Sequence, residues 1–193
     1  DGYVRDFAMN TVCAAGTGSF LDRQAERMGI KISDIGQLAL RADMPASIAG
    51  RCAVFAESDI IHKQQTGVSM ENILAGMCRA LVRNYMSNVA KGKKLEPGFC
   101  FQGGVSCNGG IKKAFEEEIG AEITVPEHNT VMGAVGAAII AGEATAKNKS
   151  RFKGFDADFD EVHTEEFTCS GCGNSCQVIR LMEGETQLGC FQD

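Results

Sequence analysis

The feature that most constrains the fold is a strand, a glycine loop, a helix and a second strand in close succession. Phe99–Phe101 is expected to be a short buried strand, and Gly103-Gly104 ends it. Asn108–Ile119 has the apolar spacing of a helix, and Glu122–Val125 is a β-branched run. This order predicts two parallel strands joined by a right-handed helical crossover, and therefore an α/β fold.

Further helices are predicted from apolar spacing and from the residues that begin and end them. The predicted ranges are Phe20–Met28, Asp34–Leu40, Cys52–Gln65 and 69–89. A last helix over 131–142 is rich in Gly and Ala, which is typical of a helix that packs closely on another backbone. At the beginning of the chain, Tyr3–Met9 is expected to be a short strand.

The charge and hydropathy of the chain exclude several classes of protein. The net charge is -6 and the sequence pI is about 5.2, which argues against a nucleic-acid partner. No apolar run approaches the roughly 18 residues of a membrane span, and no secretory signal is recognised. We therefore expect a cytoplasmic protein. The chain begins without an initiator methionine, and its first residues, Asp1-Gly2, resemble the turn of a hairpin. It is therefore expected to be a piece of a longer protein.

Composition predicts two domains joined by a linker. Residues 1–142 contain the predicted α/β elements, and 143–160 change to a mixture of Ala, Lys, Asn and Asp/Phe that is typical of a linker. Residues 161–193 contain four cysteines and too few large apolar side chains for an independent core. Something other than burial is therefore expected to stabilise this last segment.

Two glycine-rich loops are candidates for binding phosphate or nucleoside groups. Ala14–Gly18 leads into the first helix, and Phe101–Gly110 leads into the crossover helix. Glycines let a ligand approach the backbone, and the N-terminus of the following helix attracts negative charge. Each loop taken alone is equally consistent with a structural turn, but two such loops in one α/β domain favour a nucleotide site.

Cys13 and Cys52 each precede a predicted helix. A thiolate at a helix N-terminus is stabilised there and can ligate iron or act as a reactive thiol. Two ligands do not complete a metal site, so reduced, buried cysteines remain an alternative. Glu57 follows Cys52 by little more than one helical turn and could belong to a site or to a salt bridge.

Four segments together resemble one known family. Asn10–Gly18, followed by Phe20-Leu21, and Cys52–Ser58 resemble the signatures of the activator ATPases of 2-hydroxyacyl-CoA dehydratases and benzoyl-CoA reductases. Gly103–Asn108 and Pro126–Ala138 complete the family pattern in the same order. The resemblance covers about residues 5–142.

The resemblance implies an RNase H-like lobe of the fold shared by actin, hexokinase and heat-shock chaperone ATPases, with a small cysteine-rich C-terminal appendage. It implies ATP or ADP with Mg as ligand. Carried over by position, the nucleotide-binding residues would be Gly16, Thr17, Gly18, Gly103, Gly104 and Asn108. Cys13 and Cys52 would hold one [4Fe–4S] cluster between two subunits, so that a homodimer supplies the other two ligands.

The implied function is ATP-driven electron transfer. Nucleotide hydrolysis would drive a low-potential electron from a reduced ferredoxin or flavodoxin-type donor to a 2-hydroxyacyl-CoA dehydratase-like acceptor. The first lobe with its phosphate loop is absent, so we expect weak nucleotide binding and no hydrolysis by this chain alone. Calorimetry with ATP and Mg tests this, and micromolar affinity would contradict it. The alternatives are a noncatalytic, metal-stabilised interaction domain and an ATPase of the same fold without a cluster.

The C-terminal cysteines form a separate pattern. Cys169, Cys172, Cys176 and Cys190 have the form of a structural zinc site or of a second iron–sulfur site, and free or misoxidised thiols are the alternative. Their position after the activator-like domain resembles longer multidomain members of the same family. The other cysteines, Cys78, Cys100 and Cys107, are interpreted as packing residues.

Overall fold

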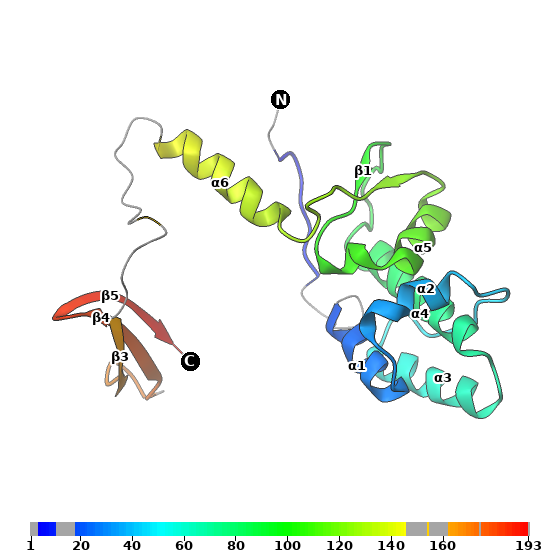
Figure 1. Ribbon diagram of the computed structural model, residues 1–193, viewed down its shortest axis with the longest axis horizontal. Coiled ribbons are helices and arrows are strands. Elements are labelled where there is room, and N and C mark those ends of the chain that lie inside the picture. Colours follow the sequence, from blue (N-terminus) through cyan, green and yellow to red (C-terminus); the bar gives the residue numbers. More distant parts are fainter. Residues whose placement is uncertain (1–3, 11–17, 146–153, 155–161, 174, 193) are drawn as a thin grey trace. The chain divides into compact units, whose positions relative to one another are not determined.

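The chain divides into two compact units, Asp1–Ala141 and Gly142–Asp193 (Figure 1). The computed structural model describes residues 4–10, 18–145, 154, 162–173 and 175–192. Within these ranges, no helix combines the length and the apolar character that a membrane crossing requires. The predicted linker 143–160 lies mostly outside the described residues, and 143–145 continue a helix.

The first unit is mainly helical, and each helix predicted from the sequence is present with small shifts at its ends. Its elements are α1 (Gly18–Met28), α2 (Ile35–Ala39), α3 (Ala53–Gln65), α4 (Met70–Asn88), β1 (Phe99–Cys100), a 3-10 helix (Gly104–Cys107), α5 (Gly109–Ile119), β2 (Ile123–Thr124) and α6 (Met132–Thr145). A short 3-10 turn, Ile32–Asp34, precedes α2.

Helix α4 is the centre of the hydrophobic core. Ser69 begins it as predicted, because its hydroxyl accepts a hydrogen bond from the Asn72 N–H at 3.3 Å. The apolar stripe of α4 is fully buried at Ile73, Leu74 and Met77. Helices α2, α3 and α5 all pack against α4. Three other helices of the first unit are therefore connected through α4.

The predicted strand–helix–strand unit is confirmed. Strands β1 and β2 are parallel, and Phe99 pairs with Ile123. The expectation that β1 is buried is wrong, because Phe99 is only half-buried and Cys100 is exposed. Within the described residues this sheet has two strands, so β1 pairs with β2 alone. Cys100 is consequently not a packing residue.

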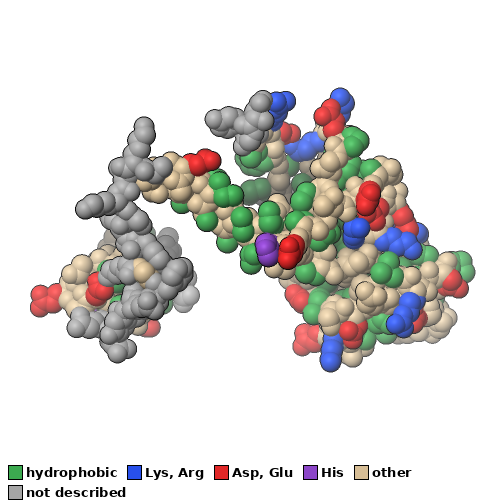
Figure 2. All heavy atoms as spheres, turned by 45° about the horizontal axis from the view of Figure 1, so that its top comes forward, with side chains coloured by type: hydrophobic (Ala, Val, Ile, Leu, Met, Phe, Trp, Pro, Cys, Tyr) green, Lys and Arg blue, Asp and Glu red, His purple; other side chains and the backbone are tan. Residues whose placement is uncertain are grey.

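Two other expectations for the first unit are wrong. Residues 4–10 form no strand, and Val4, Phe7 and Met9 are largely exposed, because no neighbouring strand pairs with them in the described chain. Helix α6 buries none of its residues, and Figure 2 shows hydrophobic side chains along its length. A Cβ atom added at Gly133 or Gly136 would meet nothing within 4 Å. Small residues allow close helix packing but do not supply the partner.

The second unit is an antiparallel sheet that the sequence analysis did not predict. Its strands β3 (Val162–Thr168), β4 (Gln177–Glu183) and β5 (Thr186–Gln192) pair in the order β3-β4-β5 (Figure 1). Glu183 pairs with Thr186 across a two-residue turn in which Gly184 has a φ of 57°. This left-handed conformation at a tight hairpin favours glycine. The Gly184-Glu185 turn between β-rich runs is the signal that could have revealed the sheet.

Candidate functional site

A cavity of about 490 Å³ brings the end of the first glycine loop together with the second. Helix α1 contributes Gly18, Leu21 and Asp22 to its lining. The remaining lining residues are Ile32, Ser33, Gly104, Val105, Cys107 and Asn108. Three of the residues predicted to contact a nucleotide, Gly18, Gly104 and Asn108, therefore share one cavity. They come from segments that lie more than eighty residues apart in the chain.

The second glycine loop has a defined conformation. Gly103 has a φ of 92°, which favours glycine, and its N–H donates to the Asn129 carbonyl at 2.7 Å. The Asn129 side-chain amide donates to Ser106 Oγ at 2.6 Å and to Cys107 Sγ at 3.3 Å. A Cβ atom at Gly104 would meet nothing within 4 Å, so the cavity side of the loop is open. Sequence reasoning missed Asn129, although it lies in the fourth family segment.

Asn108 has a structural role at the edge of this cavity. Its Oδ1 atom accepts a hydrogen bond from the Ile111 N–H at 3.1 Å, which caps helix α5. The same oxygen would lie 2.9 Å from a Cβ atom added at Gly36. The side chain is therefore held against the protein, and the predicted contact with a nucleoside would have to use its remaining amide group.

A larger recess of about 980 Å³ lies elsewhere in the first unit and is less suited to a nucleotide. Its lining is mainly apolar and includes Leu81, Phe99, Phe101 and Phe115. Among the described residues, none of those predicted to bind a nucleotide or a metal lines it. The smaller cavity with glycines on its wall is therefore the better candidate, because backbone N–H groups can approach phosphate oxygens there.

Cys52 is the residue immediately before α3, and the segment before it is held firmly. The Asn84 side chain donates to the Gly50 carbonyl at 2.6 Å, and the Ala49 N–H donates to Asp59 Oδ2 at 2.7 Å. Cys52 itself is half-buried, and its side chain makes no capping hydrogen bond to α3. The thiol is thus presented at the N-terminus of α3.

The first turn of α3 also exposes apolar side chains. Val54 is 70% exposed and Phe55 is 67% exposed. Met44, in the loop that precedes Cys52, is 75% exposed. Large exposed apolar side chains, such as Val54 and Phe55 directly after Cys52, are typical of a surface that is covered by another protein chain.

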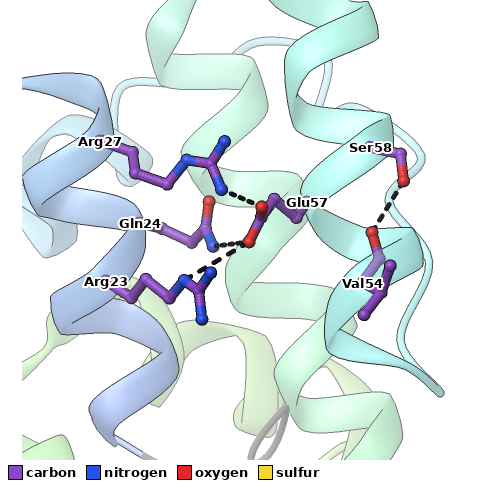
Figure 3. Close-up of polar contacts among 6 residues, drawn as sticks. All are labelled: Arg23, Gln24, Arg27, Val54, Glu57 and Ser58. Carbon is purple, nitrogen blue, oxygen red and sulfur yellow. Dashed lines mark hydrogen bonds and ion pairs between the residues drawn. The ribbon is translucent and has the colours of Figure 1, made fainter.

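Glu57 connects α1 to α3, as Figure 3 shows. Its carboxylate accepts a hydrogen bond from the buried Gln24 amide at 3.4 Å and forms ion pairs with Arg27 and, at 3.6 Å, with Arg23. All three partners lie on α1, the helix that begins at Gly18. Of the two interpretations of Glu57, the structure favours the salt bridge.

Several predicted site residues lie outside the described residues. These are Cys13, Gly16 and Thr17. Their predicted roles therefore stay predictions.

Among the other cysteines of the first unit, Cys78 is buried, which raises the pKa of its thiol to about 12 and confirms a packing role. Cys107 is exposed and lines the cavity, so its interpretation as a packing residue is wrong.

The C-terminal cysteines do not form a four-thiol group. Cys169 and Cys176 are half-buried and lie at the open end of the β3–β4 pair, with the exposed Cys172 between them in sequence. Cys190 lies on β5, opposite Arg180. Among the described residues, no three Cys, His, Asp or Glu side chains are gathered closely enough to hold a metal ion.

A comparison with protein families identifies the first unit. Residues 1–141 match the family described as "BadF/BadG/BcrA/BcrD ATPase family". The chain belongs to the BadF/BadG/BcrA/BcrD ATPase family. The match confirms the resemblance inferred from the four sequence segments, and it ends before the cysteine-rich unit begins.

Members of the BadF/BadG/BcrA/BcrD ATPase family with known roles are similar to this chain. The 2-hydroxyisocaproyl-CoA dehydratase activator of Clostridioides difficile is 33% identical over 153 residues, which cover 79% of this chain and 57% of the activator. The activator of lactoyl-CoA dehydratase of Anaerotignum propionicum is 34% identical over 146 residues, which cover 76% of this chain and 56% of that activator. The chain therefore spans little more than half the length of these relatives.

A solved structure of the same family supports the fold. The Acidaminococcus fermentans (R)-2-hydroxyglutaryl-CoA dehydratase component A matches with a TM-score of 0.72 and 35% identity, covering 76% of this chain and 56% of that chain. The predicted fold class is therefore confirmed for the first unit, which has the actin- and hexokinase-like fold of the activator ATPases. The cysteine-rich unit lies beyond the family match.

Proposed function

We propose that this chain supplies one lobe of an ATP-dependent iron–sulfur activator that transfers a low-potential electron to a 2-hydroxyacyl-CoA dehydratase-type partner. The observation that carries the proposal is the meeting of Gly18, Gly104 and Asn108 in one cavity, at the start of a helix that is bonded to the Cys52 helix. Family membership adds that several relatives are named as dehydratase activators. The chain has about half their length, so the complete activity needs the other lobe.

The nucleotide half of the proposal is supported by the shape and chemistry of the cavity. A Cβ atom added at Gly104 would meet nothing within 4 Å, so a ligand can approach the backbone there, and α1 directs the positive end of its dipole toward its first residue, Gly18. Gly16 and Thr17 would complete the phosphate contacts from the loop before α1. A relative's solved structure contains bound ADPNP, which is an ATP analogue. ATP or ADP with Mg is therefore the proposed ligand.

The cluster half of the proposal depends on Cys13 and Cys52. Cys52 fits an iron–sulfur ligand, because its thiol is half-buried at a helix N-terminus and is not engaged as a cap. A [4Fe–4S] cluster would supply a one-electron carrier, and four thiolates are its usual ligands. Two chains related by a two-fold axis would provide these four. The exposed Val54 and Phe55 beside Cys52 support an apolar contact between the two copies.

Glu57 would couple the two halves. Its contacts with Gln24 and Arg27 bond the helix of the phosphate loop to the helix that begins after Cys52. A movement of α1 in response to nucleotide would therefore move α3 and the thiol in front of it. This chain's own residues would thus transmit the nucleotide state to the surroundings of the electron carrier.

The proposed partners follow from the same function. The electron acceptor would be a 2-hydroxyacyl-CoA dehydratase-like protein, and the donor a reduced ferredoxin or flavodoxin-type protein in the cytoplasm. No role for nucleic acid or membrane is proposed, since the net charge is -6. A noncatalytic interaction domain and an ATPase without a cluster are the two alternatives that an experiment has to exclude.

Anaerobic reconstitution with iron and sulfide tests the proposal. We expect the reduced chain to show the electron paramagnetic resonance of a [4Fe–4S] cluster and to elute as a dimer with one cluster per two chains. Cys13→Ser and Cys52→Ser should each abolish the signal and the cluster-dependent dimer. Cys100→Ser is the matched control, because Cys100 is an exposed cysteine of the same unit without a proposed ligand role. A cluster that persists in Cys52→Ser would contradict the proposal.

A further inference from the structure

Two loops meet at the carboxyl ends of the parallel strands β1 and β2. Strand β1 runs into the second glycine loop, and β2 runs into residues 125–131, the β2 loop. The Phe101 N–H donates to the Thr124 carbonyl at 2.9 Å, so the strand pairing continues up to the glycine loop. In open α/β sheets, ligands bind outside the carboxyl ends of the strands. The cavity with Gly104 in its wall lies at this edge, and the β2 loop, all of which the structure describes, does not line it.

Asn129 of the β2 loop bonds to the glycine loop at three points. Its own N–H donates to the Pro126 carbonyl at 3.1 Å, which closes the turn that carries it. Its carbonyl accepts a hydrogen bond from the Gly103 N–H at 2.7 Å. Its side-chain amide donates to Ser106 Oγ at 2.6 Å and to Cys107 Sγ at 3.3 Å. An asparagine amide has two N–H donors, and both are therefore used on the glycine loop.

Ser106 connects the Asn129 amide to the backbone of the glycine loop. The Ser106 hydroxyl donates to the Gly103 carbonyl at 2.7 Å, and the Ser106 N–H donates to the same carbonyl at 3.0 Å. Because the hydroxyl proton is used in this way, the Ser106 oxygen meets the Asn129 amide as an acceptor. Ser106 is only 4% exposed, so little water reaches this oxygen in place of the amide. The bonds thus fasten the turn in which Gly103 has a φ of 92° and Gly104 has open space beside it.

We propose that Asn129 is a positioning residue for nucleotide binding, which fixes the second glycine loop in its binding conformation without contacting the nucleotide. The inference rests on the nucleotide half of the proposed function. A loop that is ordered before binding loses less conformational entropy when the ligand binds. Without the Asn129 amide, the nucleotide itself has to order the loop, and its affinity falls. A residue that only stabilised the fold would leave the affinity of the folded protein unchanged.

Alkylation of the full chain by iodoacetamide tests this role, because Cys107 is exposed and lines the cavity. Increasing concentrations of ADPNP with Mg should slow the alkylation of Cys107, measured by mass spectrometry of its peptide. The concentration that halves the rate then measures nucleotide affinity. Cys100 is the internal control, since it is exposed but lines the other recess. Asn129→Ala removes two hydrogen bonds and should raise the half-protecting concentration about tenfold.

Two further variants separate positioning from a general loss of stability. Thr130→Ala is the matched control, because Thr130 is an exposed neighbour in the same turn, and it should leave the half-protecting concentration unchanged. Ser106→Ala leaves Asn129 in place and removes its buried acceptor, so it should also weaken binding. Because the two residues act through one bond, the double variant should lose no more affinity than the weaker-binding single variant. Hydrogen exchange of α4 shows that each variant is folded.

The outcomes distinguish this inference from the function on which it rests. A folded Asn129→Ala chain that ADPNP protects as well as the parent chain would overturn the positioning role alone. Additive losses in the double variant would overturn the route through Ser106. If ADPNP does not protect Cys107 in the parent chain at any concentration, the nucleotide half of the proposed function fails, and the positioning role fails with it.

Discussion

The two units of the chain are stabilised by different means. In the first, α4 buries its apolar stripe against three other helices, and residues such as Ile73 and Met77 have no exposed surface. In the second, none of the described side chains is buried. Its strands are connected by backbone hydrogen bonds and by surface contacts such as that of the Arg180 guanidinium, whose Cζ atom lies 4.5 Å from the centre of the Phe167 ring. Packing therefore specifies the first unit, whereas the second depends on the pairing of its strands.

Truncation of a leucine in each unit gives the largest expected difference. Leu74→Ala should lower the free energy of unfolding by about 2–5 kcal/mol, because the fully buried side chain leaves a cavity. Leu181→Ala, at a half-buried position of β4, should cost about 1 kcal/mol or less. Urea unfolding can be monitored for the first unit by helical circular dichroism and for the second by hydrogen exchange of β3–β5. The two signals measure the stability loss of each unit separately. Equal losses would show that the second unit has a core of its own.

Two glycine substitutions sharpen the same contrast between packed and uncovered helices. At Gly76 in α4, an added Cβ atom would lie 2.1 Å from the Ala46 carbonyl oxygen, a backbone atom. Gly76→Ala should therefore destabilise the first unit by about 1–3 kcal/mol. The matched change Gly133→Ala in α6 meets open space and should be neutral or stabilise by up to about 1 kcal/mol. Thermal unfolding measures both, and a destabilising Gly133→Ala would indicate a partner for α6.

The sequence predicted the fold where one local pattern decides the outcome. Ser69 as a cap, the apolar stripe of α4 and the left-handed Gly120 after α5 are local signals, and all three are present. Strand burial and the packing of α6 depend on neighbours, so these expectations failed at Cys100 and at Gly133. The C-terminal sheet was not predicted, because its clearest local signal is the short turn at Gly184 and its strands bury no apolar side chain.

The segments of the candidate site could be predicted from the sequence, but the contacts between segments distant in the chain could not. The glycine loops were identified from composition and order, yet periodicity does not show that Gly18 and Gly104 line one cavity. The bonds from Asn84 and Asp59 that hold the segment before Cys52 also join residues distant in sequence. Likewise, the separation of Cys190 from Cys176 follows from strand register, which spacing along the chain does not reveal.

The smallest expected effect concerns an electrostatic contact that fastens β2 to α5 in the packed unit. Glu116 Oε1 accepts a hydrogen bond from the Ile123 N–H at 3.0 Å and pairs with Lys112 at 3.2 Å, and these contacts lower the pKa of the carboxyl group. A lowered pKa means that the contribution to stability is present above the ordinary pKa and is lost as pH falls through the lowered one. Glu116→Gln should therefore cost less than about 1 kcal/mol at neutral pH, and this difference should shrink at acidic pH, as the carboxyl group takes up a proton below its lowered pKa. Urea unfolding at both pH values measures it, with Glu118→Gln as the control for loss of charge on the same helix. A difference that persists in acid would show that the carboxylate charge is not what holds β2 in place.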